Sequence, residues 1–204
     1  MKFKNKSLIF ILSLLLVIFV FIISGLMVTL DLNFYKENFV KNNVYANFDN
    51  SSYVDEISAN LINYFNYDED LLEVYDQDER SHLQDVRWLI IYLEIFSALV
   101  FLILILIFFK YRYNYLVFMV GFVIILLFII LLYIFNYFDF LTLFTFFHKP
   151  FFDEGTYSFT NDSLLIKLFP LEFFIFAFEK ILLYSFFIAL GFFALSIYLR
   201  KTNK

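Results

Sequence analysis

The stretch LIFILSLLLVIFVFIISGLMVTL, residues 8–30, decides the fold class because it carries no charged side chain over its whole length. An apolar run of about 18 residues or more can cross the hydrocarbon core of a bilayer as a helix. Lys2, Lys4 and Lys6 precede the run, as basic residues also precede a signal peptide. However, the run is longer than the apolar core of a signal peptide, and no A-x-A cleavage pattern follows it. We therefore expect an uncleaved transmembrane helix.

Three further apolar runs extend this pattern along the chain, at about 88–109, 115–137 and 177–199. Of the 204 residues, 62% are hydrophobic and only 17% are charged, which leaves too little polar surface to cover a soluble domain of this composition. We expect an all-α membrane protein with a four-helix transmembrane bundle, built as a single integral membrane domain over residues 1–204.

The distribution of basic residues predicts the orientation of these helices. The N-terminus, the 110–114 turn and the C-terminal tail hold no acidic residue but eight basic ones: Lys2, Lys4, Lys6, Lys110, Arg112, Arg200, Lys201 and Lys204. Loop 31–87 instead holds thirteen acidic and four basic residues. Because cytoplasmic loops are enriched in Lys and Arg, we expect both termini in the cytoplasm. Loops 31–87 and 138–175 then form an extracytoplasmic cap on a multi-pass protein of the cell (plasma) membrane.

Within the cap, loop 31–87 contains a predicted helix. Ser52 can cap it, and its apolar residues recur at helical spacing, at Ile57, Leu61, Ile62 and Phe65. Residues 34–48 mix aromatic and polar side chains, which favours an extended segment.

The second loop of the cap begins with an apolar segment, residues 140–147 (FLTLFTFF), beyond a span of full length. Such a segment is expected to lie in the outer membrane interface or to dip back into the bilayer. Gly155 predicts a turn. Asp162 or Ser163 can cap a short helix that reaches Phe169, and the next residue, a proline, starts the last helix.

One of the two histidines, His82, lies at the start of the second long helix. Asp85 follows it by three residues, so the two side chains share a helix face, and the carboxylate can orient the imidazole and stabilise its protonated form. A solvated first turn is the alternative, in which Glu79, His82, Asp85 and Arg87 face water and the acids lie near the positive end of the helix dipole.

The second histidine, His148, lies among the aromatic residues of 144–152 and is bounded by Pro150 and the predicted turn at Gly155. An apolar setting favours the neutral imidazole, which suits a base or a nucleophile. An inert interfacial histidine is the alternative.

Several kinds of chemistry lack the residues that they need. The absence of cysteine excludes disulfides, thiolate metal sites and a cysteine acyl-enzyme, and no H-E-x-x-H or G-x-S-x-G pattern is present. The four glycines are scattered and no basic patch suggests nucleic acid. We expect no metal, no cofactor and no nucleic-acid partner.

Three motifs carry a resemblance to a known family. Residues 82–87 (HLQDVR) match H-x-x-D-V-[KR], and residues 147–152 (FHKPFF) match F-H-x-x-F-F. The third motif is G-x-Y-x-F at 155–159, with LIKLFP at 165–170 and the pair FF at 173–174 after it. With these motifs and four spans, the chain resembles the integral membrane family that includes the lipoprotein intramolecular transacylases of bacteria. It departs from the family at Tyr157 and Phe174, where tryptophan is usual.

The resemblance implies a membrane acyltransferase that moves the sn-2 acyl chain of a diacylglyceryl-modified lipoprotein to the α-amine of its N-terminal cysteine. The product is a lyso-form lipoprotein. The partners implied are the lipid bilayer and this lipoprotein, or a related acyl-ester lipid. The catalytic residues implied are His82 and His148.

The residue types suit that chemistry. One neutral imidazole can take a proton from the amine, while the second, held by Asp85, protonates the leaving glycerol oxygen. Arg87 can stabilise the developing oxyanion. Which histidine is the base, whether an acyl-histidine forms, and the oligomeric state stay open. The alternative function is a non-enzymatic membrane protein that binds an envelope partner through its acidic outer cap, with a transporter as a weaker third.

Overall fold

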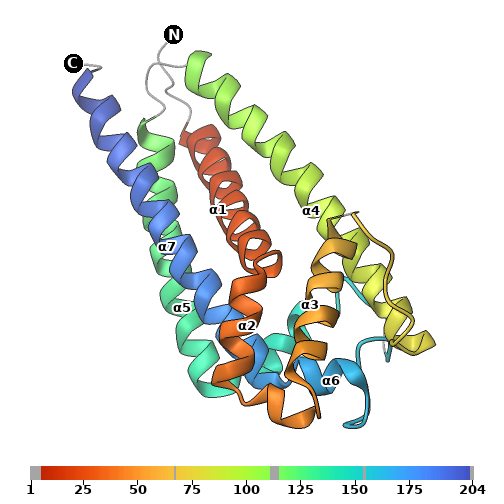
Figure 1. Cartoon of the computed structure of the whole chain (residues 1–204). Helices are drawn as coiled ribbons and strands as arrows, with labels where there is room; N and C mark the ends of the chain where they lie inside the picture. Colours follow the sequence, from red (N-terminus) through yellow and green to blue (C-terminus); the bar gives the residue numbers. More distant parts are fainter. Residues whose placement is uncertain (1–5, 67, 111–114, 154, 203–204) are drawn as a thin grey trace. The chain divides into compact units, whose positions relative to one another are not determined.

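A computed structural model describes residues 6–66, 68–110, 115–153 and 155–202. These residues form α1 (Lys6–Thr29), α2 (Leu32–Lys41), the short 3-10 helix η1 (Val44–Asn47), α3 (Ser51–Phe65), α4 (Gln77–Lys110), α5 (Tyr115–His148), α6 (Leu164–Leu168) and α7 (Leu171–Thr202) (Figure 1). Of the described helices, four are long and apolar enough to cross a membrane: α1, α4, α5 and α7. The predicted all-α membrane class is confirmed.

Each of the four long helices contributes to two compact units. The first unit comprises residues 1–25, 93–135 and 180–204, and the second comprises residues 26–92 and 136–179. Four of the basic residues that predict the orientation, Lys2, Lys4, Arg112 and Lys204, lie outside the described residues.

The first unit has an apolar core of residues from all four long helices, namely Leu16, Val17, Val20, Val100, Leu104, Phe118, Ile125 and Ala189. Phe118 stacks on Phe192 of α7 with ring centroids 5.5 Å apart. The hydroxyl of Ser13 donates to the carbonyl oxygen of Val117 at 3.0 Å. A Cβ atom added to Gly121 would lie 2.8 Å from Cδ2 of Leu16, so glycine allows α1 and α5 to approach closely.

The second unit is built around aromatic side chains from α2 and the start of α7. Phe39 packs against Phe169 and Phe173 with ring centroids 6.0 and 5.9 Å apart, and Tyr35 lies 5.2 Å from the same Phe173 ring. Asn38, fully buried on α2, donates through Nδ2 to the carbonyl oxygen of Phe173 at 3.0 Å. These contacts join α2 to the first turn of α7.

Two local predictions for the cap were wrong. Residues 34–48 are not extended but form α2 and η1, because Asp31 caps α2 through the backbone N–H of Asn33 and helical spacing buries the aromatic face of α2. The N-cap of α3 is Asn50 rather than Ser52, since the Asn50 side chain accepts the N–H of Ser52 at 2.9 Å.

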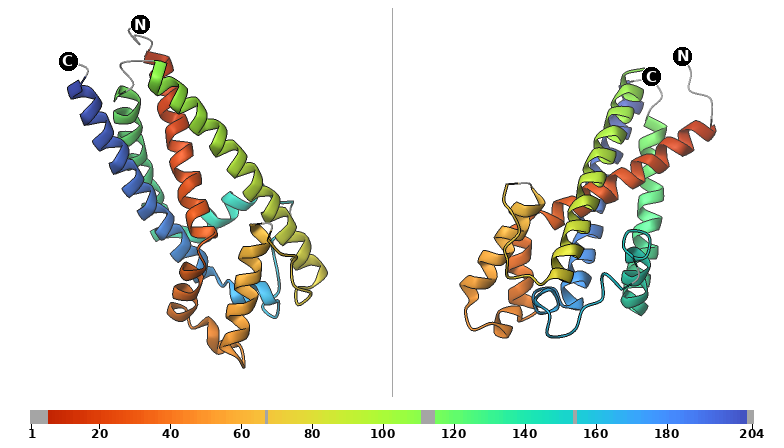
Figure 2. Two further views of the ribbon diagram at one scale, coloured as in Figure 1. Left: turned by 45° about the horizontal axis from the view of Figure 1, so that its top comes forward. Right: turned by 90° about the vertical axis from the view of Figure 1, so that its right-hand side faces the viewer.

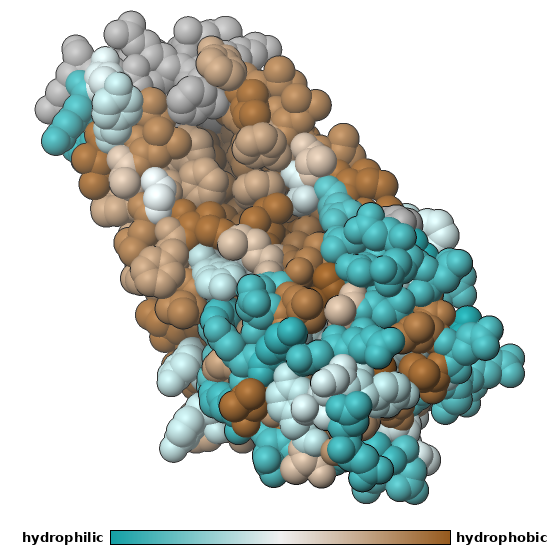
Figure 3. Space-filling view, viewed as in Figure 1, coloured by the Kyte–Doolittle hydropathy of each residue, from teal (hydrophilic) through white to brown (hydrophobic). Residues whose placement is uncertain are grey.

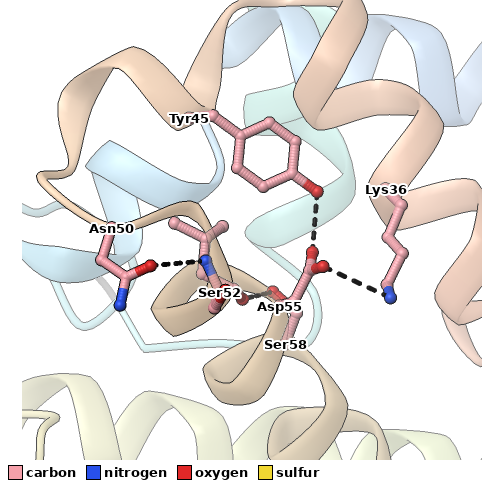
Figure 4. A network of polar contacts seen from close by, with 7 residues as sticks. Lys36, Tyr45, Asn50, Ser52, Asp55 and Ser58 are labelled. Atoms are coloured by element: carbon pink, nitrogen blue, oxygen red, sulfur yellow. Dashed lines mark hydrogen bonds and ion pairs between the residues drawn. The ribbon is translucent and has the colours of Figure 1, made fainter.

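A polar network joins α2, η1 and α3, which lie side by side in Figures 1 and 2. The phenol of Tyr45 donates to Oδ1 of Asp55 at 2.7 Å, and Lys36 pairs with Oδ2 of the same carboxylate at 3.4 Å (Figure 4). Hydrophilic residues gather over this part of the second unit in Figure 3. Asp55 therefore connects three elements of the second unit through one carboxylate.

A break in α5 separates the predicted span from the apolar segment after it. Asp139 has non-helical angles (φ −160°, ψ 77°), and its Oδ1 accepts the N–H of Thr142 at 3.0 Å. The aspartate thus caps a second helical segment, residues 140–148, which ends at His148. Gly155 adopts a φ of +92°, which confirms the predicted turn, and Ser163 caps α6.

Candidate active site

The start of α4 positions His82. Asp76 and Glu79 form a reciprocal capping box, in which the Asp76 Oδ1 accepts the Glu79 N–H at 2.8 Å and the Glu79 Oε2 accepts the Asp76 N–H at 3.0 Å. One turn later, the His82 ring packs against Phe152 and Phe159 with centroids 5.0 and 5.5 Å apart. Within the described residues, the buried Nδ1 of His82 has no hydrogen-bond partner.

The end of α5 positions His148, which is buried. Its Nδ1 lies 2.8 Å from the carbonyl oxygen of Phe144, and a carbonyl can only accept, so Nδ1 carries the proton of this bond. In the neutral ring, Nε2 then holds the free lone pair. The rings of Phe144 and Tyr157 pack on the imidazole with centroids 4.0 and 5.0 Å away. The hydrogen bond thereby selects the tautomer in which Nε2 can accept a proton.

Phe152 brings the two histidines together. The centroid of its ring lies 5.0 Å from that of His82 and 5.5 Å from that of His148. Protonation of one imidazole disfavours protonation of the other, because both rings pack on Phe152 among aromatic side chains that solvate charge poorly. The arrangement disfavours a state with two imidazolium ions, and His148 in its neutral form has a defined proton acceptor.

The remaining predicted site residues have different surroundings. The guanidinium carbon of Arg87 lies 4.3 Å from the centroid of the buried Tyr64 ring on α3. Asp85 is exposed, and the Nδ1 of His82 does not bond to it. The alternative of a solvated first turn is wrong for Glu79, whose side chain is 2% exposed.

Two further residues near the site, Tyr64 and Glu79, are identified by their contacts with other elements of the fold. Tyr64 has no sequence signal that connects it to Arg87, because α3 and α4 are separated by a loop. Glu79 has such a signal, since an acidic residue three positions after Asp76 at a helix start is typical of a capping box. Its second partner, the N–H of Leu165, lies 86 residues further along the chain and has no local signal.

Most of the chain matches the model of a known protein family. The model of the family described as lipoprotein intramolecular transacylase Lit matches residues 8–174. Among curated proteins, the sequence has no match.

Solved structures of a membrane-integral protein share the fold. The lipoprotein intramolecular transacylase Lit from Bacillus cereus matches with a TM-score of 0.81 at 20% identity, over 97% of this chain and 98% of that one. Two variants of that enzyme, in which one histidine is replaced by arginine or by alanine, each match with a TM-score of 0.76 at 21% identity, over 97% of this chain. The match covers 92% of the arginine variant's chain and 94% of the alanine variant's chain.

Proposed function

The chain belongs to the lipoprotein intramolecular transacylase family and is therefore an acyltransferase of the membrane, and from this membership we propose its reaction and its catalytic groups. The substrate is a diacylglyceryl-modified lipoprotein, and the sn-2 acyl chain moves to the α-amine of the N-terminal cysteine. Family membership favours this enzyme over the alternative of a non-enzymatic protein that binds an envelope partner.

The proposed reaction is an aminolysis within one molecule. The amine nitrogen attacks the carbonyl carbon of the sn-2 ester, a C–N bond forms, and the bond from that carbon to the glycerol oxygen breaks. One proton leaves the amine and one proton reaches the glycerol oxygen, so neither water nor a cofactor is consumed. Because donor and acceptor belong to the same molecule, positioning supplies much of the rate.

His148 is the proposed base. Its Nδ1–H is engaged with the carbonyl oxygen of Phe144, which leaves the Nε2 lone pair to take the amine proton. A neutral imidazole is required for this step, and the aromatic surroundings favour that form.

His82, in its protonated form, is the proposed acid toward the glycerol oxygen. Its buried Nδ1 has no hydrogen-bond partner among the described residues, and a buried polar atom of this kind calls for an explanation such as a substrate contact. We expect Asp85 to act through its charge alone, since it is exposed, and Arg87 to stabilise the oxyanion. The site faces the outer side of the cell membrane, with both termini cytoplasmic, as the basic flanks predict.

The packing of both imidazoles on Phe152 is the observation that carries this proposal. The test expresses the chain in a host that makes diacylglyceryl lipoproteins and identifies lipoprotein N-termini by mass spectrometry. We expect lyso-form lipoprotein with the wild-type chain and with Gln84→Ala, an exposed control on the same turn as His82. We expect none with His148→Ala or His82→Ala. Unchanged N-termini with wild-type protein present in the membrane would contradict the proposal.

A further inference from the structure

Glu79 is a buried carboxylate whose two oxygens have different partners. Its Oε2 accepts the N–H of Asp76 at 3.0 Å within the capping box of α4. Its Oε1 accepts the N–H of Leu165 in α6 at 3.0 Å, across 86 residues of chain. The side chain is only 2% exposed, and burial of a carboxylate is costly unless its oxygens are satisfied. A helix cap needs one of these bonds, so the second one calls for another explanation.

The bond to Leu165 fixes one end of the segment that covers both histidines. This segment, residues 149–153 and 155–163, begins directly after His148 and ends at the cap of α6. It carries Phe152 and Phe159, whose rings contact His82, and Tyr157, whose ring contacts His148. The end of α5 holds the first end of the segment, and Glu79 holds the second through Leu165.

Glu79 also shares a helix face with His82, because the two residues are three positions apart on α4. The Glu79 carboxylate, which holds the aromatic segment, therefore lies on the same turn of α4 as His82, which the segment covers. Displacement of the segment would change the surroundings of both imidazoles together.

We propose that Glu79 is a positioning residue for the two-histidine site, which it keeps assembled by joining α4 to the start of α6. It contacts no reacting atom and acts through Phe152, Tyr157 and Phe159. The activity arm of the test rests on the proposed function, whereas the structural arm does not.

The structural arm uses the two histidines as probes, since the chain contains no others. Selective ¹⁵N labelling of histidine gives NMR signals from only these two imidazoles. Glu79→Gln keeps the shape of the side chain but places an amide N–H₂ against a backbone N–H, so one of the two bonds is lost. We expect this variant to displace the ring signals of both His82 and His148.

Two matched controls separate positioning from other effects of the substitution. Asp78→Asn makes the same change of charge at the exposed neighbouring position. Asp76→Ala removes the acceptor of the Glu79 N–H and weakens the cap of α4, but leaves both bonds of the Glu79 carboxylate in place. We expect both controls to keep the wild-type histidine signals. Unmoved histidine signals both in Glu79→Gln and in Leu165→Pro, a variant that lacks the N–H donor to Glu79, would overturn the proposal.

If Glu79→Gln does not fold, a second pair of variants tests the same bond from its donor, the N–H of Leu165. Leu165→Pro removes the N–H donor in the first turn of α6, where a helix tolerates proline. Leu165→Ala is its control, because it keeps the N–H donor and shortens the same buried side chain. Displacement of both histidine signals by the proline variant but not by the alanine variant supports the proposal, and equal spectra overturn it.

The activity arm measures acyl transfer on a synthetic diacylglyceryl lipopeptide with purified protein. Misplaced catalytic groups lower the rate of chemistry, so we expect kcat of Glu79→Gln to fall about tenfold to a hundredfold with KM nearly unchanged. A kcat equal to that of Asp78→Asn overturns the positioning role. If the wild-type chain itself transfers no acyl group, the proposed function fails, and the NMR comparison still decides the role of Glu79.

Discussion

His82 and His148 lie against the same phenylalanine: the Phe152 centroid is 5.0 Å from the His82 ring and 5.5 Å from the His148 ring. The ring is 8% exposed, so it is held by its neighbours on several sides. The two imidazoles therefore share one aromatic packing surface. Four predictions follow from this contact and from others in the second unit.

Replacement of Phe152 by alanine tests whether acyl transfer depends on the ring that contacts both imidazoles. We expect Phe152→Ala to lower acyl transfer about tenfold to a hundredfold, because both imidazoles lose a packing surface, and to lower stability by about 3–5 kcal/mol. Phe151→Ala, at an adjacent ring that is 47% exposed, is the control and should leave both nearly unchanged. Equal loss of activity in the two variants would contradict a special role for Phe152. Formation of lyso-form lipopeptide and thermal unfolding measure the two effects.

Arg87 should not tolerate replacement by lysine. Its planar guanidinium lies over the Tyr64 ring, and an ammonium group cannot stack in this way. We expect Arg87→Lys to reduce the rate of acyl transfer about tenfold. Tyr64→Phe should keep the rate, since the ring remains, and Tyr64→Leu should reduce it. Arg80→Lys, at an exposed position of the same helix, is the matched control, and a similar loss there would argue against the stacking explanation.

Asn38 should contribute to stability through its buried bond to Phe173. Asn38→Ala removes this donor and also the contact of its side-chain oxygen with Asn42. We expect the free energy of unfolding to fall by about 1–3 kcal/mol. Val40→Ala, at a position of α2 that is 71% exposed, should change it little. Thermal unfolding in detergent micelles makes the comparison, and equal Tm values for both variants would refute the prediction.

The cap should lose stability at alkaline pH through Tyr45. Burial, then the hydrogen bond to Asp55 and the negative charge of Asp55, raise the pKa of Tyr45 from 10.0 to about 12. The neutral phenol is therefore favoured in the folded state. Its contribution is fully present below about pH 10 and is lost as the pH rises toward about 12, because the unfolded state releases this proton first.

The test compares wild-type protein with Tyr45→Phe, which cannot ionise. The stability advantage of the wild-type chain, measured by chemical unfolding of the purified protein, should shrink from about pH 10 to about pH 12. Parallel pH profiles for the two proteins would show that Tyr45 ionisation does not contribute.

Local patterns predicted the long helices but not all their ends. The second apolar run begins at Trp88, whereas α4 begins at Gln77, because the capping box of Asp76 and Glu79 starts the helix well before its apolar part. The third run ends where Asp139 interrupts α5, and the apolar segment 140–148 forms a second helical piece. Hydropathy locates the membrane-crossing part of a helix, while polar caps decide where the helix begins and ends.

The sequence patterns around His82 and His148 predicted both as site residues. The prediction that Asp85 orients the His82 imidazole depended on helix spacing alone. Asp85 is exposed, and the imidazole turns instead toward Phe152 and Phe159. Helical spacing indicates which side chains share a face, yet the rotamer follows the apolar contacts offered by other segments.

The sequence by itself determined that this chain is an all-α membrane protein with four long helices. Hydropathy and helical length are local properties, and apolar runs of this length are sufficient to cross a bilayer as helices. Only the tertiary structure decided that Glu79 is buried against Leu165, that Arg87 lies over Tyr64, and that one ring, Phe152, joins the two histidines. Those partners are distant in the chain, and their pairing depends on the path of the loops and on which buried polar groups must be satisfied.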